Sequence, residues 1–103
     1  MIWADYFKVL DQAKDARTSV RYKVKDIKCP QGTEDLKKDF LQVLDDSVRY
    51  CEVMRIGANL SFNRYYIDGY RKKEEADKID KNVQSEYASF IDEYEKVKND
   101  LLH

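Results

Sequence analysis

Apolar residues recur every three or four positions along most of this chain, which is the spacing of one face of an α-helix. The clearest stretch spans 76–101 and extends over more than three heptads. Its stripe consists of Ala76, Ile79, Val83, Tyr87, Phe90, Tyr94, Val97 and Leu101. Few glycines and one proline interrupt the rest of the chain, so the pattern predicts long helices packed on one another.

A first helix is predicted over 2–27, and it ends shortly before the chain's single proline. Its apolar positions are Ile2, Tyr6, Leu10, Ala13, Val20, Val24 and Ile27. The residue before Pro30 is pushed out of the α region, and the Thr33 hydroxyl is suited to cap a following helix. Glu34 and Asp35 then place negative charge in the first turn, where the helix dipole favours it. This predicts a helix boundary between Cys29 and Thr33.

The second predicted helix begins at Glu34, but the pattern leaves its end open. The segment 57–61 contains a glycine, an asparagine and a possible Ser61 cap, which favours an interruption. The apolar series also continues to Tyr70, as one unbroken helix would. A turn near 57–61 or near 71–75 must reverse the chain so that the stripe at 76–101 meets both other helices. The predicted fold is an all-α antiparallel bundle of three long helices, the middle one unbroken or broken to give four, in a single domain over 1–103.

Acidic residues stand four positions before basic ones at six places, a spacing that supports an exposed helix face. Each such pair contributes a few tenths of a kcal/mol. The pairs are Glu34 with Lys38, Asp45 with Arg49, Asp68 with Lys72, Glu74 with Lys78, Asp77 with Lys81, and Asp92 with Lys96. They predict helix through most of 34–98 and disfavour a long loop between 68 and 81.

Charge and hydropathy exclude several classes of partner. The chain has nineteen Lys and Arg and twenty Asp and Glu. Its net charge of −1 gives no general attraction to nucleic acid or anionic lipid. No stretch approaches the ~20 apolar residues that cross a bilayer. The start of the chain also lacks the basic and apolar regions of a secretory signal. As written, the chain is expected to be cytoplasmic, or extracytoplasmic if a signal peptide has been removed.

The two cysteines are predicted to be free thiols. Cys29 precedes the second predicted helix and Cys51 lies about five turns into it, which separates them by more than ~20 Å. A disulfide needs Cα atoms within about 7 Å. Cys51 is expected in the core.

The chain offers little for catalysis, and we expect no catalytic, cofactor or metal site. Its one histidine, His103, stands at the end, and two distant cysteines cannot complete a zinc site or a Cys/His pair. The three glycines are too scattered for a phosphate-binding loop. The neighbouring carboxylates, such as Asp45 and Asp46, point about 100° apart on a helix and fit a solvated face.

The segment 62–70 carries more aromatic surface than one helix stripe requires. Tyrosine and arginine are enriched at protein interfaces. The predicted interaction residues are Arg64, Tyr65, Tyr66, Tyr70 and Arg71. In the alternative, these rings wrap neighbouring helices and keep their hydroxyls at the rim. The basic run 71–73 is followed at once by Glu74 and Glu75, which argues against binding to single-stranded nucleic acid.

Four features follow one another along the chain: the run Val24–Pro30, then Leu36, Phe40 and Leu44, then Gly57, and the amphipathic stretch from Ala76. Together they resemble small helical-bundle domains of Gram-positive surface lipoproteins of unknown function. The resemblance implies a long helix, a Pro-containing turn and further antiparallel helices, and it supplies no catalytic residues. The chain departs from that pattern because it has no signal peptide and no lipid-accepting N-terminal cysteine.

The functional expectation is a non-enzymatic α-helical module that binds a protein partner through an apolar and aromatic patch. One alternative is a small intracellular effector, inhibitor or immunity-type protein that occludes a larger target. Another is a structural bundle that self-associates, as a homodimer, through a stripe left over after internal packing. The sequence identifies no partner.

Overall fold

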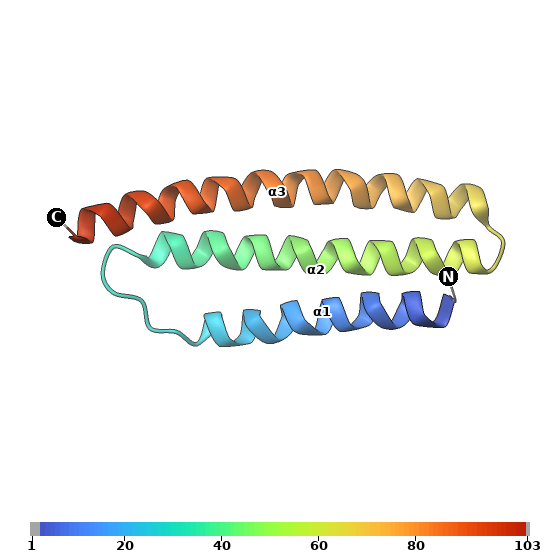
Figure 1. Ribbon diagram of the computed structural model, residues 1–103, viewed down its shortest axis with the longest axis horizontal. Coiled ribbons are helices and arrows are strands. Elements are labelled where there is room, and N and C mark those ends of the chain that lie inside the picture. The colour runs from blue at the N-terminus through green and yellow to red at the C-terminus, as the bar shows by residue number, and fades with distance from the viewer. Residues whose placement is uncertain (1–2, 103) are drawn as a thin grey trace.

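The computed structural model describes residues 3–102, and it consists of three antiparallel helices (Figure 1). Helix α1 spans Trp3–Lys25, α2 spans Glu34–Phe62 and α3 spans Tyr66–Leu102. The predicted all-α fold with three long helices is confirmed, as is the start of the second helix at Glu34. Ile2 and His103 lie outside the described residues.

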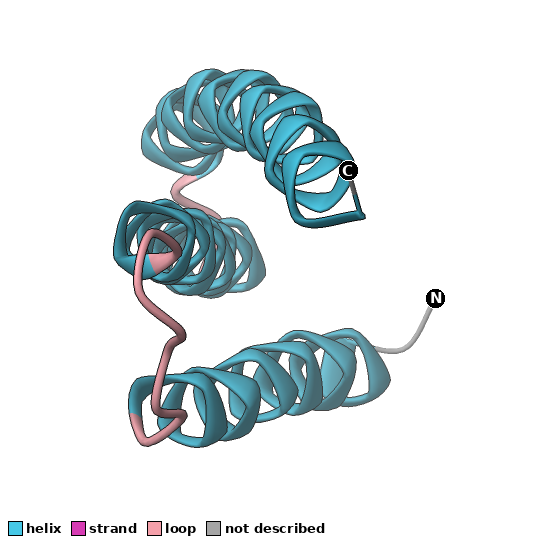
Figure 2. Ribbon diagram, turned by 90° about the vertical axis from the view of Figure 1, so that its left-hand side faces the viewer, coloured by secondary structure: helices cyan, strands magenta, loops and turns pink. Residues whose placement is uncertain are grey.

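Helix α2 lies between the other two, and no Cα atom of α1 lies within 8 Å of a Cα atom of α3 in the described chain. Seen along the helices, the three form a curved row that is open on one side (Figure 2). The molecule measures 58 × 22 × 18 Å. The expectation that the stripe of α3 would meet both other helices is therefore wrong, because α3 packs on α2 alone.

The core is small and sits between α2 and α3. Val53, Ala76 and Ile79 form its centre, and Tyr50, Met54 and Val83 pack around them. Helix α1 has no buried residue. It is attached to α2 by partly exposed side chains, including the edge-to-face pair Phe7 and Phe62, whose ring centroids are 6.0 Å apart. The three helices form one layer rather than a closed bundle.

Helix α2 runs unbroken through Gly57, so the interruption expected at 57–61 is wrong. The glycine serves close packing instead. A Cβ on Gly57 would lie 3.2 Å from the Gly69 carbonyl oxygen, and a Cβ on Gly69 would lie 3.0 Å from the Gly57 carbonyl oxygen and overlap Ser61 Oγ. Only glycine permits α2 and α3 to approach this closely at their joined ends. No turn occurs at 71–75, which lies within α3.

The turn between α2 and α3 lies at residues 63–65. The Tyr65 N–H donates to the Leu60 carbonyl at 2.9 Å, and the Arg64 N–H donates to the Ser61 carbonyl at 3.0 Å. This is the hydrogen-bond pattern of a Schellman motif, which usually places glycine in the left-handed position. Here Arg64 occupies that position with φ 69°.

One local expectation is corrected, whereas the helix predicted through most of 34–98 from the acid–base pairs is confirmed. Thr33 is the N-cap residue of α2, but its side chain makes no capping bond. Its hydroxyl donates instead to the Pro30 carbonyl at 2.7 Å, which closes the preceding turn. Within the described chain, none of the six acid–base pairs forms an ion pair. Some of these residues form ion pairs elsewhere, such as Asp45 of α2 with Arg21 of α1.

Both cysteines are free thiols, as predicted, and Cys51 is buried. Burial raises the pKa of the Cys51 thiol, and the nearby cation of Arg17 only partly opposes this. Cys29 lies in the connection between α1 and α2 and is partly exposed.

Candidate interaction face

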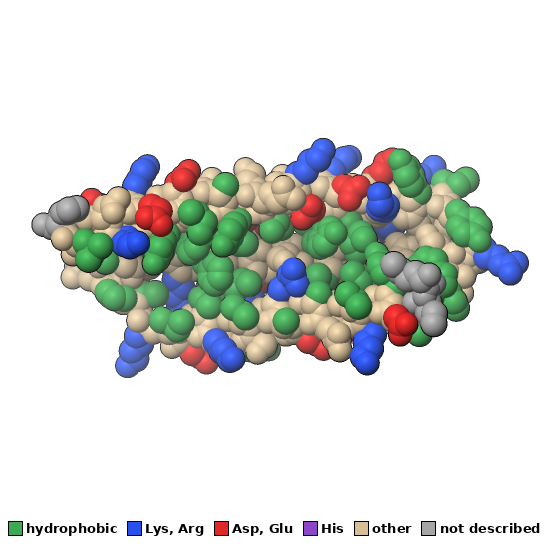
Figure 3. Space-filling model, viewed as in Figure 1, with side chains coloured by type: hydrophobic (Ala, Val, Ile, Leu, Met, Phe, Trp, Pro, Cys, Tyr) green, Lys and Arg blue, Asp and Glu red, His purple; other side chains and the backbone are tan. Residues whose placement is uncertain are grey.

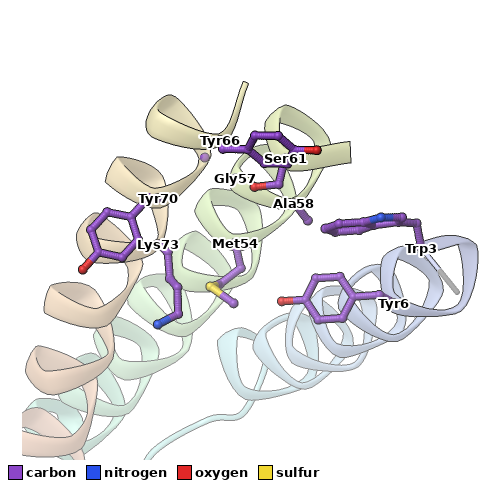
Figure 4. A pocket seen from close by; sticks show the side chains of 10 residues that line it. Trp3, Tyr6, Met54, Gly57, Ala58, Ser61, Tyr66, Tyr70 and Lys73 are labelled. Atoms are coloured by element: carbon purple, nitrogen blue, oxygen red, sulfur yellow. The ribbon is translucent and has the colours of Figure 1, made fainter. Parts of the chain in front are cut away.

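The open side of the helix row carries a hollow at the end where α2 turns into α3 (Figure 4). All three helices line it. Trp3 and Tyr6 come from α1, and Tyr66, Tyr70 and Lys73 from α3. The floor is Met54, Gly57, Ala58 and Ser61 of α2, together with Gly69. The hollow measures about 370 Å³. Because the floor residues are mostly small, the aromatic rings stand above it as walls.

A second hollow of about 340 Å³ lies at the opposite end of the molecule. Its α3 residues include Leu102 and four that follow Tyr66, Gly69, Tyr70 and Lys73 by four heptads, namely Tyr94, Val97, Lys98 and Leu101. Residues a whole number of heptads apart share one side of a supercoiled helix. Both hollows therefore open on the same side of α2 and α3. We call this side, from the Trp3–Tyr66 end to the Leu36–Leu101 end, the open face.

A line of residues spaced by seven connects the two hollows along α3. It consists of Tyr66, Lys73, Asp80, Tyr87, Tyr94 and Leu101. Tyr87 is 49% exposed and Tyr94 is 45% exposed, although both rings lie beside Phe90. Phe90 itself stacks on Phe40 of α2 with ring centroids 5.0 Å apart. The tyrosines thus form a half-buried second row above an internal aromatic pair.

Hydrophobic side chains gather in a band along the middle of the open face, and charged ones mostly fringe its edges (Figure 3). Lys73 and Lys98 are the charged residues among those that line the two hollows. Near the middle, Arg17 Nε donates to Ser47 Oγ at 2.5 Å. The pKa of Tyr50 is raised by burial, then by the carboxylate of Asp80 and the phenol of Tyr6. The face is therefore apolar and aromatic with isolated charges.

The structure divides the five predicted interaction residues. Tyr66 and Tyr70 line the first hollow. Arg64 and Tyr65 lie in the turn before α3, and Tyr65 is 61% exposed. Arg71 pairs with Asp68 on the outside of the same helix, with 3.8 Å between nitrogen and oxygen. Arg64, Tyr65 and Arg71 line neither hollow.

Most residues of the open face are not among the predicted interaction residues. Trp3 and Tyr6 belong to a different helix from Tyr66, and nothing in the spacing of α1 alone shows that their side remains uncovered. Tyr87 and Tyr94 were assigned to a packed stripe. The sequence did contain a signal for their exposure, because the hydroxyl groups of these two tyrosines favour contact with water.

A pair of carboxylates lies on α2 and α3 away from the hollows. Glu86 faces Asp46, and Glu86 Oε2 is buried without a hydrogen-bond partner. Burial raises the pKa of Glu86 to about 7, and the nearby carboxylate of Asp46 adds to the effect. Asp46 also accepts a hydrogen bond from Gln42 at 3.1 Å. The raised pKa of Glu86 bears on the stability of the fold.

The described residues 3–102 contain neither a cluster of metal ligands nor a candidate membrane span. No three His, Cys, Asp or Glu side chains there converge on a point that could hold a metal ion. None of α1, α2 and α3 combines the length and apolar character needed to cross a membrane.

No protein-family model, curated protein sequence or solved structure matches this chain. The resemblance to lipoprotein domains stays a prediction.

Proposed function

We propose that this chain is a protein-interaction module that works by covering an apolar surface of another polypeptide with its open face. The observation that carries the proposal is that α1 and α3 flank α2 with their backbones apart, since none of their Cα atoms lie within 8 Å of each other. This leaves Trp3, Tyr66 and Tyr70 exposed around a floor of small residues. Aromatic rings around such a floor are the usual anchors of protein interfaces.

Binding suits this face better than chemistry does. The polar side chains of the first hollow are two tyrosines from α3, Tyr6, Trp3, Ser61 and one lysine. Those of the second hollow are one lysine, one threonine and one tyrosine. A reaction site needs a base or nucleophile held near a second polar group. The isolated lysines and phenols of the open face provide no such pair among the described residues.

Site-specific photo-crosslinking in the native cell tests the proposal. A benzoylphenylalanine at position 70, in the first hollow, is expected to crosslink reproducibly to one polypeptide. The matched control is position 22, because Tyr22 is 64% exposed on α1 and lines neither hollow. Absence of product at position 70, or the same product from both positions, would contradict the proposal.

A further inference from the structure

We propose that the open face binds a second copy of this chain, packed face to face about a two-fold axis with the two α3 helices antiparallel. This rests on the proposed function, because it names the polypeptide that covers the same face. Three observations support it: the excess of exposed surface, the extent of the aromatic row, and the placement of the two lysines.

The chain exposes too much surface for an isolated folded monomer of its size. Its accessible surface is 7785 Å², whereas a folded monomer of 12.3 kDa exposes roughly 6,100 Å². The excess of roughly 1,700 Å² arises from the elongated row of helices and from the open side between α1 and α3. Homodimers bury roughly 1,000–2,500 Å² per partner. The excess thus equals the share that one protomer contributes to a stable dimer.

The aromatic residues alone supply a large part of that area. Trp3, Tyr66, Tyr70, Tyr87 and Tyr94 are between 38% and 64% exposed. At 150–250 Å² for a fully buried aromatic side chain, they expose roughly 400–650 Å² together. The first hollow lies near the start of α3 and the second near its end. A partner that covers both must be as long as α3, which has 37 residues and extends over about 55 Å. A second copy of the chain meets this requirement.

The positions of the two lysines that line the hollows favour an antiparallel pair of α3 helices over a parallel pair. A net charge of −1 gives two copies little mutual repulsion. In a parallel pair, each lysine of the hollows would face the same lysine of its partner. In an antiparallel pair centred on residue 84, midway along α3, Lys98 lies level with Tyr70 of the partner subunit, and Lys73 lies within one residue of the level of Tyr94 of the partner subunit. An ammonium group over a tyrosine ring is attractive, whereas two facing ammonium groups repel.

Solution mass tests the association directly. Sedimentation of the purified chain over a range of concentrations is expected to show twice the monomer mass of 12.3 kDa. Tyr66→Ser and Tyr94→Ser should each raise the dimer dissociation constant at least tenfold. Tyr22→Ser is the matched control, because Tyr22 and Tyr66 are both 64% exposed and Tyr22 lines neither hollow. Circular dichroism confirms that each variant remains helical. A dimer that both face variants leave intact would overturn the proposal.

Disulfide trapping tests the orientation. In a Cys29→Ser background, Tyr70→Cys with Lys98→Cys is expected to give a covalent dimer on mild oxidation. The two positions are about 42 Å apart within one chain, so an internal bridge cannot form. Lys98→Cys alone should not crosslink. A covalent dimer from Lys98→Cys alone would indicate a parallel pair and overturn the antiparallel assignment.

The outcomes separate this inference from the proposed function. A purified chain that stays monomeric at every concentration overturns the second copy as the occupant. If position 70 still crosslinks to a different polypeptide in the cell, the proposed function stands with another partner. If neither the dimer nor the crosslink forms, both proposals fail.

Discussion

Glu86 is expected to make the protein less stable as the pH rises through neutrality. The side chain faces Asp46 across α2 and α3, with Oε2 buried and unpartnered. Burial, and then the neighbouring Asp46, raise the pKa of Glu86 from 4.5 to about 7. An acid whose pKa is higher in the folded state than in the unfolded chain favours folding while it is protonated. This contribution is complete below pH 4.5 and is lost as the pH rises through about 7.

The magnitude follows from the pKa difference and the position of the side chain. One pKa unit corresponds to about 1.4 kcal/mol, so the full difference between 4.5 and about 7 would give about 3 kcal/mol. Part of the Glu86 side chain contacts solvent, and water screens the interaction. We therefore expect about 1–2 kcal/mol.

Glu86→Gln isolates this effect, because glutamine keeps the size of the side chain and stays neutral at every pH. Its amide can also donate to the Asp46 carboxylate. Urea unfolding followed by circular dichroism at pH 4.5, 6 and 8 is the assay, at one protein concentration throughout. The variant should match the parent at pH 4.5 and exceed its unfolding free energy by about 1–2 kcal/mol at pH 8. Groups common to both proteins cancel in the difference.

The control is Glu93→Gln, seven residues further along α3 on the same side of the helix, where the side chain is exposed. That variant should differ from the parent by less than about 0.5 kcal/mol at every pH. The reasoning about Glu86 would be refuted if Glu86→Gln changed the stability by the same amount at pH 4.5 and pH 8.

Three further measurements address the packing, the turn and the thiols. Gly69→Ala should lower the unfolding free energy by about 1–2 kcal/mol despite the better helix propensity of alanine, because its Cβ would crowd the α2 backbone. Ser61→Ala should relieve part of that loss, and strict additivity in the double-mutant cycle would contradict the close approach. Arg64→Gly should raise stability by about 0.5–1 kcal/mol by relieving the left-handed strain at φ 69°, whereas Arg71→Gly, inside α3, should lower it by about 1 kcal/mol. A thiol reagent at pH 8 should modify Cys29 in the folded protein and Cys51 only after unfolding, since Cys51 is buried; equal rates for the two thiols would refute that burial.

The helices themselves were predictable because local signals agree with one another. The heptad stripe from Ala76 and the proline turn before Thr33 each specify helix type and boundary without reference to the rest of the chain. The turn at 63–65 was not predictable, since its left-handed residue is Arg64 rather than glycine. The break was therefore expected near Gly57. In the structure, the missing side chain of Gly57 instead allows α3 to approach α2 closely at Gly69.

The arrangement of the helices was less predictable than their existence. An apolar stripe shows that a side must be covered, but it does not say which helix covers it. The stripe of α3 is wide enough to pack on α2 through Ile79 and Phe90 and still present Tyr87 and Tyr94 to solvent. Tyr66 and Tyr70, which the excess of aromatic residues singled out, line the first hollow, whereas Trp3 and Tyr6 required knowledge of where α1 lies.

The attachment of α1 shows why the open face matters for the stability of the whole chain. Its ion pairs to α2 are Arg21 with Asp45, Lys14 with Glu52 and Arg55 with Asp11, all partly exposed. Such pairs each contribute about 0–1 kcal/mol, and α1 buries no residue to add to them. Trp3 and Tyr6 of α1 line the first hollow instead. A polypeptide seated on the open face would bury these rings against Met54 and Tyr66 and so attach α1 through both of its sides. If the proposed partner occupies this face, we expect it to strengthen the attachment of α1 as well.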